Sequence, residues 1–304
     1  MKRREFIQKT AASSAFICVV GLPLSSFDSI ENNHLTVLHT NDVHSYIDPF
    51  PPSHPKSPNM GGVARRAAII EAIRKENDNV LLLDAGDIFQ GTPYFNYYGG
   101  ELEFKLMSMM KYDLATMGNH DFDNGIEGFY KQLPHAQFDF VSANYDFKNT
   151  ALDGLVKPYK IFYKKGIKIG VFGLGVQLDG LVDKKNYKET KYNDPLEISK
   201  DMTRILKQQE KCDLIICLSH IGYKYKDEHN RICDCTLASQ TKDIDLIIGG
   251  HTHTFLDKPT ILKNLEGKEV LVNQVGCYGI NLGRIDFYFE KQSKTTNGRS
   301  IVVS

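Results

Sequence analysis

The sequence lacks the features that mark several special classes of protein. Lys plus Arg and Asp plus Glu number 37 each among 304 residues, so there is no basic excess to neutralise phosphates, and we expect no nucleic-acid partner. Six cysteines are too few for a disulfide scaffold. We find no internal repeat. The composition, 41% apolar and 24% charged, is that of an ordinary globular protein, so the function has to be read from motifs.

The first 26 residues predict an export signal. Arg3 and Arg4 precede an apolar stretch over residues 10–24, which is shorter than the ~20 residues that a membrane span needs. The paired arginines, followed by Phe6 and Ile7, resemble a twin-arginine signal, so we expect export to a bacterial periplasm and no stable membrane span after processing. An uncleaved amphipathic anchor is the alternative. Residues 27–304 contain no linker and are expected to form one domain.

Apolar runs of strand length alternate with helical stretches along the rest of the chain. This alternation predicts an α/β fold in which helices cover sheets. The later runs have fewer helices between them, so we expect mixed sheets, and the tail from residue 291 is expected to be an edge strand or a frayed end. The expected strands cover residues 35–40, 80–83, 114–117, 138–143, 167–174, 214–218, 244–248, 270–275 and 284–289, and the expected helices cover residues 63–75, 101–111, 126–132 and 196–211.

Five clusters of Asp, Asn and His directly follow apolar runs. Ligand sites in α/β proteins form beyond the carboxyl ends of strands, so clusters that are far apart in the sequence can meet there. Asp42-x-His44 and His251-x-His253 are spaced so that an extended backbone turns both side chains of a pair to one side. The clusters are Asn41-Asp42-Val43-His44, Asp84-Ala85-Gly86-Asp87, Gly118-Asn119-His120-Asp121, Ser219-His220 and Gly249-Gly250-His251-Thr252-His253.

The joint pattern predicts a dinuclear metal site, although one pair alone would be weak evidence. A lone histidine is more often a structural residue, but five of the ten histidines lie in these clusters. Nitrogen and oxygen ligands without a thiolate suit two divalent ions such as Zn, Mn, Fe or Co. Cys233-x-Cys235 is too closely spaced for an ordinary disulfide and lacks a partner pair for zinc, so we expect no redox or metal role for it.

The order of these clusters resembles that of the calcineurin-like metallophosphoesterases, and the flanking residues resemble the 5′-nucleotidase/UDP-sugar hydrolase family. The likeness extends over about residues 35–290 and implies a four-layer α/β/β/α sandwich with two mixed sheets, the fold of metallo-dependent phosphatases. The matching segments are Leu-Thr-Val-Leu-His-Thr-Asn-Asp from Leu35, Leu-Leu-Leu-Asp-Ala-Gly-Asp from Leu81, Met-Gly-Asn-His-Asp-Phe-Asp from Met117, Ile-Ile-Gly-Gly-His-Thr-His from Ile247, and glycine motifs at residues 61–65 and 279–283.

The resemblance implies a metal-ligand role for most of the clustered side chains. Asp84 precedes the Gly86-Asp87 motif and is instead expected to be a structural hydrogen-bonding group. Asp121 stands where relatives often have Glu, and we expect it to support the ligands without binding metal. The implied ligands are Asp42, His44, Asp87 and His253 for one ion, and Asp87, Asn119, His220 and His251 for the other, with Asp87 bridging both.

The resemblance also implies a reaction. Two cations that share a carboxylate and a water lower the pKa of that water, so that hydroxide can attack phosphorus near neutral pH. His120 would face the phosphate or the leaving group and stabilise charge or donate a proton, while Asp123 would keep the ring oriented and partly cationic. The alternative for Asp123 is a turn residue before Asn124. The implied enzyme releases inorganic phosphate from nucleoside monophosphates or related small phosphoesters.

Members of this family normally carry a C-terminal domain that binds the nucleobase, whereas this sequence ends soon after residues 283–287. We therefore expect that domain to be absent. Either a separately encoded nucleotide-binding domain acts as a partner, or the lone domain hydrolyses phosphoesters with loose specificity. Two other functions stay open: a thiosulfohydrolase of sulfur oxidation, which resembles the same family, and a metal-binding subunit without turnover.

Overall fold

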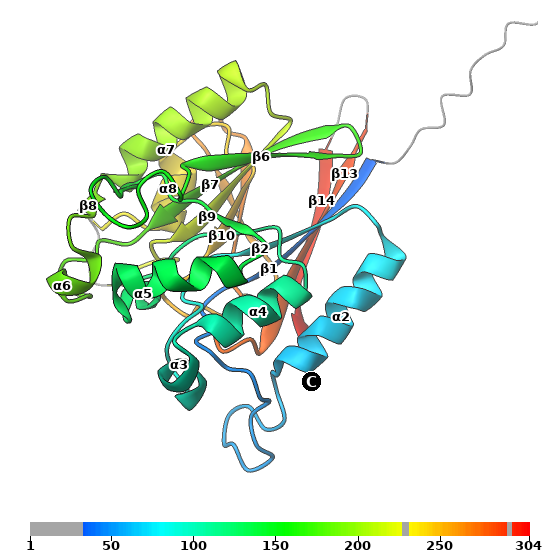
Figure 1. The fold of residues 1–304 in the computed structure, drawn as a ribbon. Coiled ribbons are helices and arrows are strands. Elements are labelled where there is room, and N and C mark those ends of the chain that lie inside the picture. The colour runs from blue at the N-terminus through cyan, green and yellow to red at the C-terminus, as the bar shows by residue number, and fades with distance from the viewer. Residues whose placement is uncertain (1–32, 227–230, 291–293) are drawn as a thin grey trace, which may run out of the picture. The chain divides into compact units, whose positions relative to one another are not determined.

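Two six-stranded sheets form the centre of the described part of the chain (Figure 1). The computed structural model describes residues 33–226, 231–290 and 294–304, so the export signal predicted over residues 1–26 lies outside the described residues. In spatial order, the first sheet consists of β14 (Lys294–Val302), β13 (Asn281–Phe289), β1 (Asn33–Thr40), β2 (Val80–Asp84), β3 (Leu114–Ala115) and β4 (Asp139–Phe140). The second consists of β11 (Thr260–Lys263), β12 (Glu269–Asn273), β10 (Leu246–Gly249), β9 (Leu214–His220), β7 (Ile167–Gly175) and β6 (Tyr159–Lys164).

Both sheets are mixed, which confirms the prediction. In the first sheet β1, β2, β3 and β4 are parallel, whereas β13 is antiparallel to both β1 and β14. In the second sheet β7, β9, β10 and β12 are parallel, and the edge strands β6 and β11 run antiparallel to their neighbours. The tail of the chain forms the edge strand β14. A separate two-stranded sheet pairs β5 (Tyr145–Asp146) with β8 (Lys191–Tyr192).

Helices cover the outer faces of both sheets, which confirms the α/β/β/α sandwich (Figure 1). The helix predicted over residues 196–211 is α-helical only to Arg204 and continues as a π-helical turn. None of the helices in the described segments has the length and apolar character that a membrane span requires. The helices are α2 (Val63–Glu76), α4 (Glu101–Met109) and α5 (Gly125–Gln132) on the first sheet and α7 (Pro195–Arg204) and α8 (Asp234–Gln240) on the second. The shorter elements are α3 (Pro93–Tyr98), α6 (Lys184–Tyr187), the 3₁₀ turns η1 (His120–Phe122) and η2 (Leu133–His135), and the π turn η3 (Ile205–Gln209).

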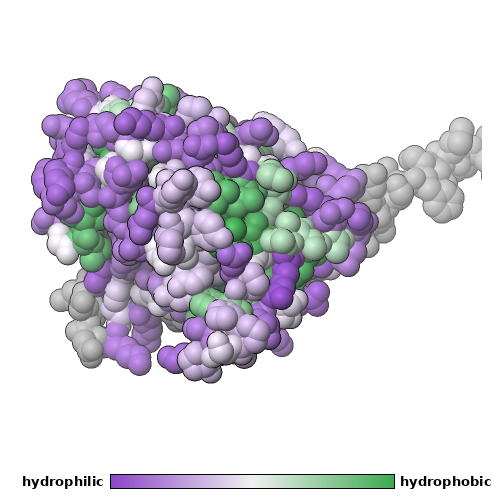
Figure 2. All heavy atoms as spheres, turned by 60° about the horizontal axis from the view of Figure 1, so that its bottom comes forward, coloured by the Kyte–Doolittle hydropathy of each residue, from purple (hydrophilic) through white to green (hydrophobic). Residues whose placement is uncertain are grey.

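Apolar clusters hold these layers together. In β1, Leu35 and Val37 pack between the two sheets, whereas Leu38 packs under the helices. In β2, Leu81 likewise packs between the two sheets and Leu82 packs under the helices, because successive side chains of a strand point to opposite faces. Burial on both faces explains why these strands read as continuous apolar runs in the sequence. On the face shown in Figure 2, hydrophilic residues dominate the surface and apolar residues gather in small areas.

Candidate metal centre

The candidate site lies in loops that follow parallel strands of both sheets. Backbone hydrogen bonds join the loops after β1 and β2: the Asp42 N–H donates to the Gly86 carbonyl (2.9 Å), and the His44 N–H donates to the Asp87 carbonyl (3.0 Å). The loop after β10 joins them, because the His251 N–H donates to both carboxylate oxygens of Asp42 (2.9 and 3.1 Å). Segments that are remote in the sequence therefore meet at one place.

Two groups of side chains at this place could each hold a metal ion. Within each group, the potential ligand atoms all lie within 4.8 Å of one another. In the first group, the Nε2 atoms of His44 and His253 are 3.0 Å apart, and His253 Nε2 is 3.4 Å from Asp42 Oδ1. The first group consists of Asp42, His44 and His253, and the second of Asp87, His220 and His251.

Asp87 lies between the two groups. Its Oδ2 is 3.0 Å from His220 Nε2 and 3.8 Å from His44 Nε2, so one carboxylate oxygen is near a histidine of each group. Asp42 Oδ1 lies farther from the same two nitrogens, at 3.9 Å from His220 Nε2 and 4.0 Å from His44 Nε2. Both carboxylates are buried. Asp87 is therefore placed where a ligand shared by the two groups would lie.

Asn119 lies beside the second group. Its Oδ1 is 2.8 Å from His251 Nδ1. The next residue, His120, donates its backbone N–H to Asp87 Oδ1 at 2.8 Å, and this bond ties the segment to the carboxylate between the groups. All the side chains implied as ligands by the sequence resemblance thus come together in the structure.

The ring of His120 borders the first group and is held by Asp123. His120 Nδ1 is 2.7 Å from Asp123 Oδ2, and the ring centroid is 5.2 Å from that of His44. The hydrogen bond with Asp123 raises the pKa of His120 above its ordinary value, because it stabilises the cationic imidazolium. The His120 ring is therefore held by Asp123 at the edge of the candidate centre.

Five of the candidate ligands have a left-handed backbone conformation, so the extended backbone expected for the Asp42-x-His44 and His251-x-His253 pairs is wrong. A non-glycine residue in this region is strained by about 1–3 kcal/mol, and such residues cluster where the surrounding structure holds a functional geometry. The hydrogen bonds between the loops supply that restraint here. The φ angles are 50° for Asp42, 51° for His44, 55° for Asp87, 71° for His251 and 50° for His253.

Backbone carbonyls orient two of the histidines. His220 Nδ1 is 2.7 Å from the Ala85 carbonyl, and His44 Nδ1 is 3.3 Å from the Phe89 carbonyl. A proton on Nδ1 that is donated to a carbonyl leaves the Nε2 lone pair for a metal ion. His220 Nε2 is fully buried, and its close contact is the carboxylate of Asp87, 3.0 Å away, so both atoms could be ligands of the same ion. Ala85 and Phe89 could not be identified from the sequence, because they orient the histidines through their backbone carbonyls and not through their side chains.

Asp121 supports the loops as predicted. Its carboxylate accepts four backbone N–H groups, from Asp87 and Gly118 on Oδ2 (3.0 and 2.8 Å) and from Ile88 and Phe89 on Oδ1 (3.0 and 3.1 Å). Both oxygens are therefore used within the protein. Asp121 joins the segment that contains Asp87 to the segment that precedes Asn119.

Asp84 is a structural hydrogen-bonding group, also as predicted. It accepts hydrogen bonds from the Thr40 hydroxyl (2.6 Å) and from the Gly86 N–H (2.8 Å). Burial raises the pKa of Asp84 to about 7. Asp84 belongs to neither of the two groups.

The donor set fits divalent cations. Imidazole and carboxylate ligands suit Zn, Mn, Fe or Co, and neither group contains a thiolate. The described cysteines, Cys233 and Cys235 among them, are free thiols. Buried charges need a partner or a metal, and this region buries several carboxylates. Asp42, Asp84, Asp87, Asp121 and Asp234 are each at most 1% exposed.

Comparison with known proteins agrees with this geometry. The sequence profile of the calcineurin-like phosphoesterases matches residues 35–255. The chain belongs to the calcineurin-like phosphoesterase family. Membership places it among the phosphoric ester hydrolases and implies divalent metal ions, for which the two groups described above are the candidate ligands.

Several relatives of this phosphoesterase chain are nucleotide hydrolases by name. It is 35% identical to the trifunctional nucleotide phosphoesterase protein YfkN of Bacillus subtilis, over 88% of this chain and 19% of that protein. It is 33% identical to the snake venom 5′-nucleotidase of Naja atra, over 86% of this chain and 51% of that protein. The crystal structure of a 5′-nucleotidase precursor from Thermus thermophilus superposes with a TM-score of 0.79 at 33% identity, over 88% of this chain and 54% of that one. The chain thus spans about half the length of these 5′-nucleotidases.

Proposed function

We propose that this chain is a metal-dependent phosphoester hydrolase of the 5′-nucleotidase type, which releases inorganic phosphate from nucleoside monophosphates or related phosphoesters. The observation that carries the proposal is the position of Asp87, whose Oδ2 is near a histidine of each ligand group. Relatives named 5′-nucleotidase, which align along most of this chain, support the substrate class.

In this proposal the two groups hold two divalent ions. When bound, such ions polarise phosphoryl oxygens and activate water for attack on phosphorus. Nitrogen and oxygen ligands are compatible with Zn, Mn, Fe or Co. Asp42, His44 and His253 would hold one ion, Asn119, His220 and His251 the other, and Asp87 would contact both.

His120 and Asp123 supply acid–base chemistry from the protein itself. Because Nδ1 of His120 is occupied by Asp123, Nε2 is the nitrogen available to a substrate. The raised pKa of His120 favours the imidazolium, which can stabilise charge on the phosphoryl group or donate a proton to the leaving alkoxide. Asp123 acts through His120 and is a positioning residue.

Hydrolysis assays with metal-loaded protein test this function. AMP, UDP-glucose, 2′,3′-cyclic AMP and p-nitrophenyl phosphate offer four different leaving groups. We expect phosphate release from AMP that EDTA abolishes and that Zn or Mn restores. If none of the four compounds is hydrolysed in a metal-dependent manner, the proposed function is wrong.

A periplasmic location is a separate proposal, based on Arg3 and Arg4 at the start of the sequence. Residues 1–32 fused to a folded reporter should direct it to the periplasm of a bacterium with an intact twin-arginine pathway. The same fusion should stay in the cytoplasm when the two arginines are changed to lysine. Export that is unaffected by this change would contradict the proposal.

A further inference from the structure

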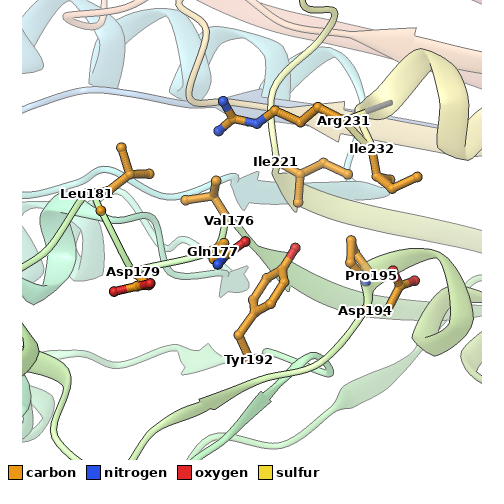
Figure 3. A pocket seen from close by; sticks show the side chains of 11 residues that line it. Val176, Gln177, Asp179, Leu181, Tyr192, Asp194, Pro195, Ile221, Arg231 and Ile232 are labelled. Carbon is orange, nitrogen blue, oxygen red and sulfur yellow. The ribbon is translucent and has the colours of Figure 1, made fainter. Parts of the chain in front are cut away.

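Buried polar side chains lie next to the ligand loops, whereas the pocket shown in Figure 3 contains none of the candidate ligands. That pocket, of about 510 Å³, includes Ile221, the residue after His220, but no side chain of either ligand group. Asn41 and Gln274 are buried beside the ligand loops, at 2% and 0% exposure. Because a buried polar side chain is almost always hydrogen-bonded, the bonds of these two residues show which parts of the centre they hold.

Gln274 is hydrogen-bonded to the histidine loop, residues 250–254, which contains two candidate ligands. Its Nε2 donates to the Gly250 carbonyl at 2.6 Å. Its Oε1 accepts the Thr252 hydroxyl at 3.2 Å and the Thr254 backbone N–H. An amide oxygen has two lone pairs, and here both accept a hydrogen bond. Gln274 therefore acts on the loop and is not itself a ligand.

The segment that contains Gln274 is fixed to the loop after β1. The Val275 N–H donates to Asn41 Oδ1 at 3.0 Å, and Asn41 Nδ2 donates to the Gly276 carbonyl at 2.6 Å. The same Nδ2 donates to Asp42 Oδ2 at 2.7 Å, so Asn41 joins this segment to a candidate ligand of the first group. Gln274 therefore has a fixed position relative to Asp42.

The histidine loop needs such support because its two histidines are strained. His251 and His253 have φ angles of 71° and 50°, and left-handed residues other than glycine persist only where the surrounding structure holds them. His251 belongs to the second ligand group and His253 to the first. The shape of the loop therefore determines how far apart the two groups present their ligands.

We propose that Gln274 is a positioning residue that fixes the spacing of the two metal ions by holding the histidine loop in its strained shape. It does so through three hydrogen bonds to the loop, from a segment that Asn41 joins to Asp42. The inference rests on the two-ion centre of the proposed function and adds a residue that lies outside all five ligand clusters. Loss of the amide should leave every ligand present but misplaced.

Hydrogen exchange of the full chain after EDTA treatment tests this role without any ion. In Gln274→Met the side chain keeps its length but loses all three hydrogen bonds. Residues 250–256, and the Thr254 N–H above all, should exchange about tenfold faster, while β10 and β12 should exchange as in the wild type. Gln274→Glu, which keeps an acceptor for the Thr254 N–H, should retain more protection than Gln274→Met.

Gln240→Met, at an exposed position at the end of α8, is the matched control and should exchange as the wild type does. Equal exchange of residues 250–256 in Gln274→Met and the wild type would overturn the proposal. Faster exchange throughout the chain would also overturn it, because Gln274 would then support the whole fold and not the loop.

Manganese binding tests the effect on the ions. Two manganese ions that share a carboxylate are magnetically coupled, so electron paramagnetic resonance distinguishes pairs from single ions. Gln274→Met should bind manganese about 10- to 100-fold more weakly and show a larger share of uncoupled ions than the wild type and Gln240→Met. Unchanged affinity and an unchanged spectrum would contradict the proposal. If the wild type itself holds only single ions, the two-ion centre of the proposed function fails, and hydrogen exchange alone decides whether Gln274 holds the loop.

Discussion

The backbone N–H of Asp87 donates a hydrogen bond to Asp121 at 3.0 Å, although the two residues lie in loops that follow different strands. The same oxygen of Asp121 accepts the N–H of Gly118 at 2.8 Å, one residue before Asn119. The buried carboxylate of Asp121 therefore fixes Asp87, the candidate shared ligand, relative to the segment that contains Asn119.

Replacing Asp121 tests whether this connection matters for the metal centre. In Asp121→Asn an amide nitrogen takes the place of one acceptor oxygen, so two of the four backbone donors lose their partner. We expect metal affinity to fall about 10- to 100-fold, as for other groups that hold metal ligands in place. Competition with a chromophoric chelator measures the change, and Asp153→Asn at an exposed position is the control. Wild-type affinity in Asp121→Asn would show that the connection is dispensable.

His120→Ala separates an acid–base role from a ligand role. The ring borders the first group but belongs to neither, so two metal ions per chain should remain. Loss of a positioned acid or base lowers turnover by about 100- to 10,000-fold, and we expect kcat for AMP to fall within that range. Elemental analysis and steady-state kinetics on the same sample test both parts. Loss of metal from this variant would mean that His120 is a ligand.

The hydrogen bond between Asp123 and His120 predicts a change in the pH profile. Because Asp123 raises the pKa of His120, the imidazolium persists to higher pH in the wild type. Asp123→Asn should lower that pKa, so the alkaline decline in kcat should move to lower pH. The change should leave KM nearly unaffected, since Asp123 acts only through the ring. A variant with lower kcat at every pH and an unshifted profile would contradict this role.

The candidate ligands were predictable from the sequence, whereas the edge strands and the groups that orient the ligands were not. β1 and β2 are buried on both faces and read as apolar runs, so the Asp and His residues that follow them stand out. The sequence does not predict the edge strands β6 and β11, because their half-exposed residues form no such run. The orientation of His220 depends on the backbone carbonyl of Ala85, and a backbone contact of this kind has no pattern in the sequence.

Removal of metal should destabilise the protein. Asp42 and Asp87 are buried close together, and bound cations would offset their repulsion and the left-handed strain of their loops. Ions that bind only the folded state add about 2.7 kcal/mol at a free concentration one hundred times Kd. We therefore expect a clear drop in Tm with EDTA and recovery with Zn or Mn, measured by calorimetry.

Asp87→Asn is the matched control for this experiment, because the amide removes the shared charge while it keeps the shape of the side chain. Its Tm should depend little on added metal. A wild-type Tm that is identical with and without EDTA would contradict a metal centre at this position.

The central claim is that two cations bind side by side with Asp87 between them. Anomalous diffraction from crystals of the protein grown with manganese tests it directly. We predict two anomalous peaks, one beside Asp42, His44 and His253 and the other beside Asn119, His220 and His251, with the Asp87 carboxylate in contact with both. A single peak, or peaks away from these residues, would contradict the account.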